Sequence, residues 1–391
     1  MLPLTGYRVL DLSLRLPGSL CTQILADLGA DVVKIEDPGG GDPFRRTPPL
    51  AGSTGSFFQI TNRNKRGVAL DLRHPRGREV FLRLAAGADV LFENFRTGTL
   101  DRMGLGYDAI REFNPRIIYC SLTGFGPDGP YRDRPAHDLD FLALSGLLYL
   151  LKREGELPPV PESQIAGAGG GISAALGILA AVIRRERTGE GGKVDAAVFD
   201  GLTPLLGLAM AQRMADGGAR RESLVGGAYA CYNVYETRDG KYLTLGCLEE
   251  KFWRAFCRAV EREDLAGDQL APEPRRSALL REVRALMRQR SLKEWTELLG
   301  KHEICFAPVN SPEEAMNDPH ATHSGLWFNG KHPHDGDVPQ QGFPVRFSGV
   351  RPGWRNHPPA LGEHTREILA EIGCSTEEIE GLLAAGVILY A

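Results

Sequence analysis

Residues 7–36, YRVLDLSLRLPGSLCTQILADLGADVVKIE, place two short apolar runs on either side of a segment with helical spacing. The runs at 7–13 and 31–36 are continuously apolar and do not alternate, which is typical of strands buried on both faces of a sheet. Parallel strands need a crossover connection, and a helix is its usual form. This stretch therefore predicts a strand, a helix and a second strand parallel to the first.

The same alternation continues along the chain. Further strand candidates lie at 67–72, 89–95 and 116–126, and helical segments separate them. Residues 1–130 therefore indicate repeated βαβ units, which predict an α/β fold with a Rossmann-like parallel sheet. A long small-residue helix ending at Gly189 and another strand candidate at 193–201 extend this pattern.

The sequence pattern changes after about residue 215. The segment 232–246, YNVYETRDGKYLTLG, has the Asp-Gly signal of a β-hairpin between alternating apolar positions, and amphipathic helices follow it. We therefore expect a smaller α+β domain over 221–329, with linkers, and a large α/β domain formed by 1–220 and 330–391. Residues 317–360 are rich in His, Pro and Gly and indicate a long connection.

Composition excludes several classes of protein. The chain has 391 residues, a formal charge of −4, 42% hydrophobic and 25% charged residues, which is ordinary for a globular protein. A nucleic-acid binder that relies on net charge, a disordered chain and a disulfide-dense miniature are all disfavoured. The seven cysteines form no CxxC pair, and no signal-peptide pattern begins the chain. The most apolar helix candidate, near 172–184, is short for a membrane span, so we expect a cytoplasmic protein that is not embedded in a membrane.

Common cofactor and hydrolase motifs are absent: no GxGxxG follows a strand, and there is no Walker A loop, HExxH or GxSxG. The histidines of HATH (320–323) and HPHD (332–335) are predicted to be loop residues and not metal ligands. The segment 62–83 has seven Lys or Arg against two acidic residues, a local charge of +5. Such a segment fits the phosphates of a nucleotide-like ligand, or simply a solvated charged surface. Arg96 in ENFRTG favours the ligand, because strand ends are where ligands bind.

His137 is the candidate general base. It lies between a Gly/Pro-rich loop and an apolar helix candidate, and Asp138 and Asp140 follow it closely. The dipole at a helix N-terminus disfavours protonation of an imidazole, so a neutral His137 could accept a proton. A structural or solvent-facing role is the alternative.

Several long motifs, in this order, resemble the class III CoA-transferase superfamily (CaiB/BaiF family), which includes formyl-CoA and carnitine CoA-transferases and α-methylacyl-CoA racemase. The motifs are LTGYRVLDLS, LADLGADVVKIEDPGGGDPFR, NRNKRGVALDLRHPRGR, DVLFENFRTGTLDRMGLGYDAI, NPRIIYCSLTGFGPDGPYRDRPAHDLDFLALSGLL and GILAAVIRRERTGEGGKVDAAVFDG. The resemblance implies a large CoA-binding domain built from both chain ends, a smaller middle domain and two interlocked subunits. It also implies an acyl-CoA thioester as substrate, with no metal. Five residues occupy family positions near the CoA adenine and phosphates: Arg63, Asn64, Lys65, Arg73 and Arg96.

The resemblance implies two alternative chemistries. In the transferases an aspartate attacks the acyl thioester; in the racemases a histidine and that aspartate exchange the Cα proton through an enolate. The racemase histidine corresponds to His137, with Asp138 behind it, and a racemase glutamate in a stretch similar to LGCLEEKFW corresponds to Glu249. The family aspartate aligns with Gly167, or with Ala166 in the racemase spacing, so neither position carries a carboxylate.

Three hypotheses follow from this departure. The leading one is racemase-like proton transfer at Cα of a 2-substituted acyl-CoA by His137, with Glu162, Glu249, Asp138 or a water replacing the second base. The second is a CoA-transferase that moves CoA between carboxylic acids, through a displaced nucleophile or as the aspartate-lacking subunit of a heteromer whose paralogous partner supplies it. The third is a non-catalytic acyl-CoA binder. The sequence leaves open the acyl group and whether the dimer is homomeric.

Overall fold

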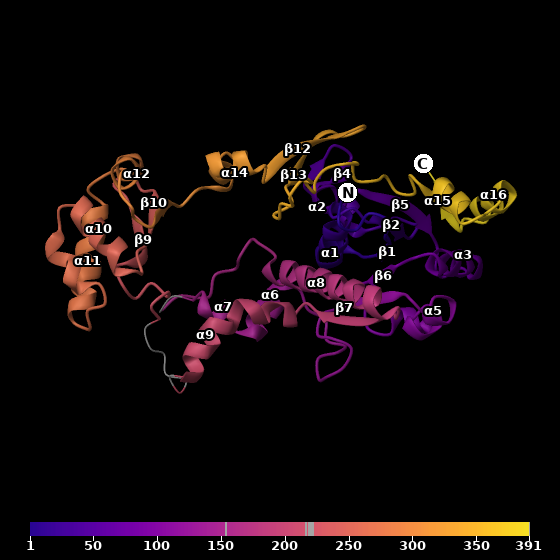
Figure 1. Cartoon of the computed structure of the whole chain (residues 1–391), viewed down its shortest axis with the longest axis horizontal. Coiled ribbons are helices and arrows are strands. Elements are labelled where there is room, and N and C mark those ends of the chain that lie inside the picture. The colour runs from indigo at the N-terminus through magenta and orange to yellow at the C-terminus, as the bar shows by residue number, and fades with distance from the viewer. Residues whose placement is uncertain (153–154, 216, 218–222, 391) are drawn as a thin grey trace. The chain divides into compact units, whose positions relative to one another are not determined.

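The computed structural model describes residues 1–152, 155–215, 217 and 223–390. The chain divides into two compact units, Met1–Gly207 with Thr322–Ala391, and Leu208–Ala321 (Figure 1). The sequence placed the corresponding boundaries at 220/221 and 329/330. We call these parts the α/β unit and the middle unit.

The α/β unit is built on a seven-stranded sheet with the order β14-β5-β2-β1-β6-β7-β8. Its strands are β1 (Arg8–Leu12), β2 (Asp31–Glu36), β5 (Lys65–Leu70), β6 (Val90–Glu93), β7 (Ile118–Thr123), β8 (Gly192–Ala197) and β14 (Ile388–Leu389). All neighbours pair in parallel except β14, which runs antiparallel to β5 at the edge. The predicted α/β fold with a parallel sheet is confirmed. The edge strand β14 was not predicted, because two residues are too short for a recognisable strand pattern.

Helices cover both faces of the sheet. The main ones are α1 (Arg15–Asp27), α3 (Pro75–Ala86), α5 (Tyr107–Phe113), α8 (Ile165–Thr188), α15 (Thr365–Glu371) and α16 (Thr376–Ala384). Leu10 and Val33 pack in one core cluster with Phe81 of α3 and Ile368 of α15. The adjacent strand residue Val9 is 1% exposed, so the opposite face is buried as well. This double burial explains the continuously apolar strand sequences.

Helix α8 runs along β7 and packs against α1, β7 and β8 (Figure 1). It ends at Gly189, whose φ of 78° provides the left-handed cap. A Cβ on Gly171 would lie 2.5 Å from the carbonyl oxygen of Pro17, so glycine is what permits the close approach to α1. With 24 residues, α8 extends beyond the apolar segment near 172–184 that the sequence analysis considered short for a membrane span. By length and composition alone it could cross a membrane, although 44% of its apolar window is buried against the rest of the chain.

The middle unit contains a three-stranded antiparallel sheet and three amphipathic helices. Its elements are β9 (Tyr232–Glu236), β10 (Tyr242–Gly246), β11 (Phe306–Pro308), α10 (Glu250–Ala259), α11 (Arg275–Met287) and α12 (Leu292–Leu299). Gly240 has a φ of 72° in the predicted hairpin turn. Trp253, Phe256 and Trp295 are fully buried in its own core. Strand β11 was not predicted.

The region 317–360 corrects the sequence analysis. It is not only a connection, since it contains α14 (Pro319–Ser324) and a hairpin of β12 (Trp327–His332) and β13 (Gly336–Gln341). Strand β13 of this hairpin packs against the short helix α2 (Ser56–Thr61). His332, predicted to be a loop histidine, is a strand residue with 9% exposure.

The remaining elements are short or connecting. They are the 3-10 helices η1 (Pro43–Arg45), η2 (Asp200–Leu202) and η3 (Glu263–Asp268), the strands β3 (Leu50–Ala51) and β4 (Thr54–Gly55), and the helices α2 (Ser56–Thr61), α4 (Thr99–Arg102), α6 (Asp138–Ser145), α7 (Leu147–Leu150), α9 (Thr203–Ala215) and α13 (Pro312–Met316). The apolar helix candidate that follows His137 is divided into α6 and α7, because Gly146 is left-handed with a φ of 87°.

Candidate functional site

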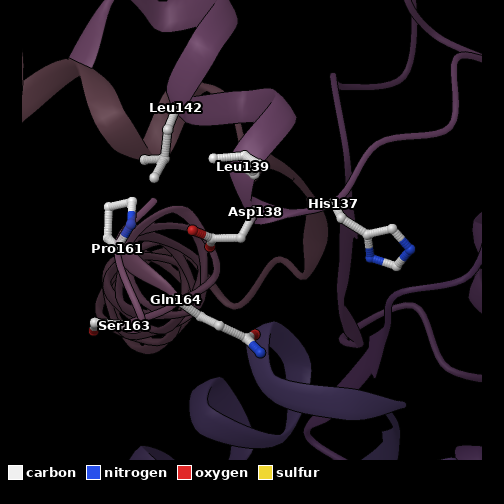
Figure 2. A pocket seen from close by; sticks show the side chains of 7 residues that line it. All are labelled: His137, Asp138, Leu139, Leu142, Pro161, Ser163 and Gln164. Atoms are coloured by element: carbon white, nitrogen blue, oxygen red, sulfur yellow. The ribbon is translucent and has the colours of Figure 1, made fainter. Parts of the chain in front are cut away.

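A pocket of about 190 Å³ lies where α6 begins and where the chain enters α8 (Figure 2). The start of α6 forms one wall, and the Pro-rich segment before α8 forms the other. Its lining residues are His137, Asp138, Leu139, Leu142, Pro161, Ser163 and Gln164. The pocket therefore contains two residues that the sequence analysis selected.

Asp138 joins the two walls of this pocket. Its Oδ1 accepts the backbone N–H of Gly167, the third residue of α8, at 2.8 Å. Figure 2 shows the carboxylate pointing toward the start of α8. The first N–H groups of a helix lack partners within the helix, and their dipoles stabilise a negative charge. Asp138 thus places a carboxylate where the first turn of α8 favours one.

Gly167 is the position that aligns with the family aspartate. A Cβ there would meet Leu16 Cδ2 at 3.4 Å, Pro17 Cγ at 3.5 Å and Asp138 Oδ1 at 3.6 Å. These are ordinary contacts or nearly so, and the position therefore has room for the start of a side chain. Ala166, the alternative alignment, is fully buried. Among the carboxylates that the sequence analysis named as substitutes, Asp138 is the one that reaches this turn within the α/β unit.

His137 is the N-cap residue of α6, and its backbone N–H donates to Asp140 Oδ2 at 2.8 Å. The residue is exposed, and Figure 2 shows its imidazole pointing away from the Asp138 carboxylate. His137 and Asp138 are therefore adjacent in sequence, but their functional groups diverge. His137 is accessible to a ligand, whereas Asp138 is bound to α8.

The two predicted glutamates lie elsewhere. Glu249 is the exposed N-cap residue of α10 in the middle unit. Glu162 is exposed in the segment that precedes α8, next to the lining residue Pro161. Glu162 therefore lies beside the pocket. Glu249 belongs to the middle unit, whereas His137 belongs to the α/β unit.

The basic segment at 62–83 is not a phosphate-binding surface throughout, which corrects the interpretation from charge. Arg63 is 1% exposed and binds Asp27 through its Nε at 3.0 Å and its Nη2 at 2.5 Å. The amide of Asn64 donates to Asp27 Oδ1 at 2.7 Å. Lys65 Nζ is buried 3.0 Å from Asp11 Oδ2. These three side chains are paired inside the chain because a buried charge is stable only with partners.

The other two predicted CoA-binding residues are exposed. Arg73 is 70% exposed and pairs with Asp37 at 2.8 Å and Asp71 at 2.9 Å. Arg96 follows β6, is exposed, and has no ion pair within the described ranges. Of the five residues, Arg73 and Arg96 are therefore the two whose guanidinium groups a phosphate can reach from solvent.

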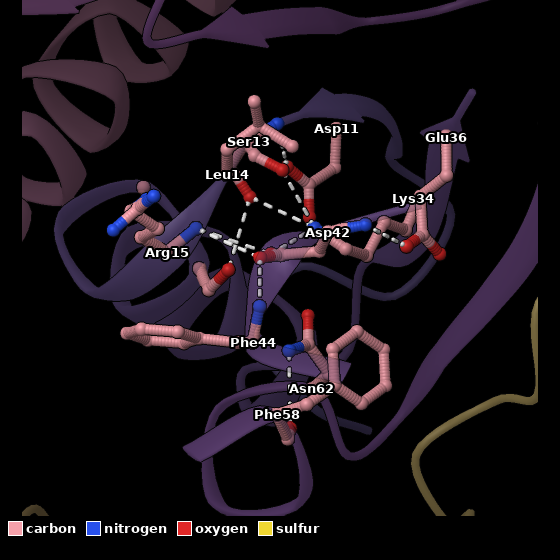
Figure 3. Close-up of polar contacts among 12 residues, drawn as sticks. Asp11, Ser13, Leu14, Arg15, Lys34, Glu36, Asp42, Phe44, Phe58 and Asn62 are labelled. Atoms are coloured by element: carbon pink, nitrogen blue, oxygen red, sulfur yellow. Dashed lines mark hydrogen bonds and ion pairs between the residues drawn. The ribbon is translucent and has the colours of Figure 1, made fainter. Parts of the chain in front are cut away.

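A buried group of charges holds the loops that follow β1 and β2 (Figure 3). We call Asp11, Lys34, Asp42 and Lys65 the polar cradle; all four side chains are fully buried. Lys34 Nζ lies 3.3 Å from Asp42 Oδ2 and donates to the carbonyl oxygen of Ser13 at 2.7 Å. Burial opposes ionisation of Asp11, but the Lys65 and Lys34 cations outweigh it and lower the pKa of Asp11 to about 2. Asp11 is therefore ionised at neutral pH.

The cradle also fixes the start of α1. Asp42 accepts the N–H of Arg15 at 3.2 and 3.1 Å, and the N–H of Phe44 at 2.9 Å. Asn94, after β6, clamps Leu14 through two hydrogen bonds of 2.8 Å each. The sequence analysis did not select Arg15, Asp42 or Asn94. In the described ranges no group of three or more His, Cys, Asp or Glu is arranged to hold a metal ion.

Comparison with known proteins gives consistent matches along the chain. The model of CoA-transferase family III matches residues 4–365. Succinyl-CoA:glutarate CoA-transferase of Mus musculus is 34% identical over 397 residues, which cover 99% of this chain and 91% of that protein. Alpha-methylacyl-CoA racemase of Homo sapiens is 33% identical over 382 residues, with coverage of 96% and 95%.

Two further matches bear on assembly and fold. The beta subunit of succinyl-CoA–L-malate CoA-transferase from Chloroflexus aurantiacus is 34% identical, with coverage of 99% of this chain and 98% of that subunit. The crystal structure of a CaiB/BaiF family protein from Brucella suis superimposes with a TM-score of 0.83 at 30% identity, and covers 95% of this chain and 99% of that one. The resemblance drawn from the sequence motifs is thereby confirmed.

Proposed function

Because the chain belongs to CoA-transferase family III, whose relatives here include both transferases and a racemase, we propose that it transfers the Cα proton of a 2-substituted acyl-CoA thioester. The observation that carries this proposal is the hydrogen bond from the Gly167 N–H to Asp138, because residue 167, which aligns with the family aspartate, has no carboxylate itself. Acylation of Asp138 would neutralise the carboxylate that caps α8, whereas proton transfer leaves that cap intact. The site therefore favours proton transfer over a covalent acyl-enzyme.

Each part of the pocket has a role in this reaction. The exposed imidazole of His137 removes the proton from Cα, and the electrons of that C–H bond move into the thioester to form an enolate. Backbone N–H groups of the glycine-rich turns hold the enolate oxygen. The imidazolium then returns a proton to Cα, and exchange with solvent makes that proton a different one. Arg73 and Arg96 are the residues we assign to the CoA phosphates, because both are exposed.

Exchange of the Cα proton in D₂O tests the proposal. The wild-type protein is expected to incorporate deuterium into a 2-methylacyl-CoA, and His137→Ala to lose on the order of 10²–10⁴-fold in rate. His302→Ala is the matched control, since His302 is an exposed histidine of the middle unit. Absence of exchange with every 2-methylacyl-CoA tried would contradict the proposal.

A second candidate is a CoA-transferase whose carboxylate comes from a paralogous partner chain. Two observations favour it: Gly167 has room for a side chain, and one relative is named as a beta subunit. Borohydride or hydroxylamine trapping of a covalent acyl group separates the two functions. A covalent adduct on the purified wild-type chain, without any partner chain, would contradict proton transfer. An adduct that forms on the Gly167→Asp variant but not on wild type would show that the pocket accepts the missing carboxylate. Acyl-CoA binding without either reaction would indicate a non-catalytic binder.

We also propose that the chain works as a dimer in the cytoplasm, either with a second copy or with a carboxylate-bearing paralogue. In support of the dimer, α8 leaves apolar side chains exposed: Ile172 at 56%, Leu176 at 68% and Ile183 at 54%. Exposed apolar surface of this kind favours association with another chain. Analytical ultracentrifugation of the purified protein and fractionation of its native cells test the two statements, and a monomer or a membrane fraction would contradict them.

A further inference from the structure

Another pocket of the α/β unit, of about 460 Å³, shares no residue with the pocket at the start of α8. We call it the turn pocket, because a tight turn over 347–350 forms one wall and the end of α14 forms the other. Its lining residues are His323, Arg346, Phe347, Gly349, Val350 and Arg351, all within the α/β unit. Three of them are basic and none is acidic, so the wall offers donors to an anion.

The turn places two arginines opposite each other. The Val350 N–H donates to the Phe347 carbonyl oxygen at 3.4 Å, and the two residues form an antiparallel bridge. Gly349 closes the turn with a φ of 76°. The next residues outward in this register are Arg346 and Arg351, and residues directly opposite in an antiparallel pair project to the same side. Both arginines line the pocket, as this register requires.

The two guanidinium groups have no counter-ion. Arg346 is exposed, and within the described ranges no carboxylate pairs with it or with Arg351. Arg351 donates from Nη2 to the carbonyl oxygen of Ser324 at 2.8 Å, which ties it to the end of α14 and leaves its other N–H groups available. Like charges directly opposite each other are destabilising. An anion held between the two arginines would remove that repulsion.

The wall fits a phosphate monoester better than a carboxylate. A phosphate monoester carries a charge of about −1.5 to −2 and three acceptor oxygens, which match two guanidinium groups and the imidazole of His323. A carboxylate has one charge and two oxygens. Phe347 is 39% exposed at the same wall and provides a ring for an apolar group to pack against. The volume also lies within the range of about 300–1,000 Å³ that is common for small-molecule sites.

We propose that the turn pocket binds a small phosphate monoester, at a site separate from the one that takes the acyl-CoA. Arg346 and Arg351 hold the phosphate between them, and Phe347 contacts its organic group. This inference does not depend on the reaction that the α/β unit carries out. CoA also contains a phosphate monoester, on its ribose, so the experiment separates that source from a free ligand.

Calorimetric binding of phenyl phosphate and of free CoA, in a buffer without phosphate, tests the inference. Wild type is expected to bind phenyl phosphate, and Arg346→Gln to bind it about 10–100-fold more weakly, because a hydrogen bond between charged groups is lost. Affinity for CoA is expected to stay unchanged. Arg111→Gln, an exposed arginine on α5, is the matched control and should bind both probes like wild type.

Three outcomes of this experiment would overturn the inference. They are no binding of phenyl phosphate to wild type, equal affinity of wild type and Arg346→Gln for it, and a parallel loss of CoA affinity in the variant. The last outcome would assign the two arginines to the phosphate of CoA.

Thermal melting gives an independent measurement. Without ligand, Arg346→Gln is expected to melt no lower than wild type, because the substitution removes one of two like charges. Phenyl phosphate is expected to raise the melting temperature of wild type and not of the variant, since a ligand stabilises only the folded state that binds it. Equal stabilisation of both proteins would overturn the inference. So would a markedly lower melting temperature of the unliganded variant, because it would give Arg346 a structural role.

Phe347→Ala tests the contact with the organic group. Wild type is expected to bind phenyl phosphate more tightly than inorganic phosphate, and Phe347→Ala to bind the two probes with similar affinity, because the ring contact is lost. Equal affinity of wild type for the two probes would overturn the assignment of an organic ester. Retention of the preference in Phe347→Ala would overturn the role of Phe347.

Discussion

The polar cradle and the pocket at the start of α8 are both groups of charged side chains in the α/β unit, but they differ in how fully their charges are paired. Asp11 and Lys65 of the cradle are fully buried and contact each other at 3.0 Å. In the pocket, His137 is exposed and Asp138 is half-buried. A buried charge without a partner is too costly to keep, whereas a group that binds a ligand must retain bonding capacity. Exposure and unmet bonding capacity, more than local charge, therefore distinguish the candidate ligand site from the cradle.

The largest effect is expected from breaking the cradle. Lys65→Met leaves the Asp11 carboxylate buried without its nearest cation, and we expect a loss of about 3–5 kcal/mol in the free energy of unfolding. Arg73→Met is the control from the same basic segment; because Arg73 is 70% exposed, its effect is expected to stay within about 0.5 kcal/mol. Urea denaturation measures both. Equal, small effects would show that the cradle does not differ from the surface charges.

A smaller effect is expected from filling two glycines of α8. Gly171→Ala would bring a Cβ to 2.5 Å from the Pro17 carbonyl oxygen, and such overpacking typically costs about 1–3 kcal/mol. Gly167→Ala meets its nearest atom at 3.4 Å, and alanine favours a helix over glycine by about 0.5–1 kcal/mol. We therefore expect destabilisation in the first variant and none in the second. Thermal melting compares them, and a destabilised Gly167→Ala would contradict the room assigned to that position.

The fold was predicted where short-range pattern determines it. Continuous apolar runs predicted the parallel strands, and Gly189 predicted the end of α8. The β12–β13 hairpin was missed, although Asp335-Gly336 in its turn is the same dipeptide signal as Asp239-Gly240. The high content of His, Pro and Gly around it concealed the alternation of its strands.

The site was predicted less completely, because its contacts join distant parts of the chain. A charge of +5 over one segment cannot reveal that Lys65 pairs with Asp11, or that Arg63 pairs with Asp27. The contact between Asp138 and Gly167 likewise spans 29 residues. Sequence placed both residues in the site through family resemblance, and only the folded arrangement selects Asp138 as the carboxylate at that turn.

The next effect concerns the contact between Asp138 and α8. Asp138→Ala removes the acceptor of the Gly167 N–H, and loss of a carboxylate at a helix N-terminus typically costs about 0.5–2 kcal/mol. Asp138→Asn keeps an oxygen that can accept this hydrogen bond, so we expect a smaller loss. Thermal melting of the two variants measures the difference. If both melted like wild type, Asp138 would not contribute to the stability of α8.

The smallest effect is expected at His332, a buried histidine that, like the cradle, uses its bonding capacity inside the fold. Its Nδ1 accepts the backbone N–H of Asp335 at 3.0 Å and that of His334 at 3.3 Å. Burial lowers the pKa of His332; the Asp335 carboxylate opposes this shift, and the ring of His357 adds to it. Protonation would also place a hydrogen on a nitrogen that already accepts two donors.

The sign of the pH dependence follows from that lowered pKa. The unfolded chain binds a proton at His332 below about pH 6.5, whereas the folded chain resists it, so this contribution to stability is complete above that pH and is lost as pH falls below it. Urea denaturation between pH 5 and 8 is expected to show a shallower pH dependence for His332→Gln than for wild type. The exposed His302→Gln serves as control and should retain the wild-type slope, because His302 lies in the middle unit and outside the hairpin. Identical slopes for wild type and His332→Gln would mean that the hairpin tolerates the charge, and that exposure, more than bonding, separates this histidine from His137.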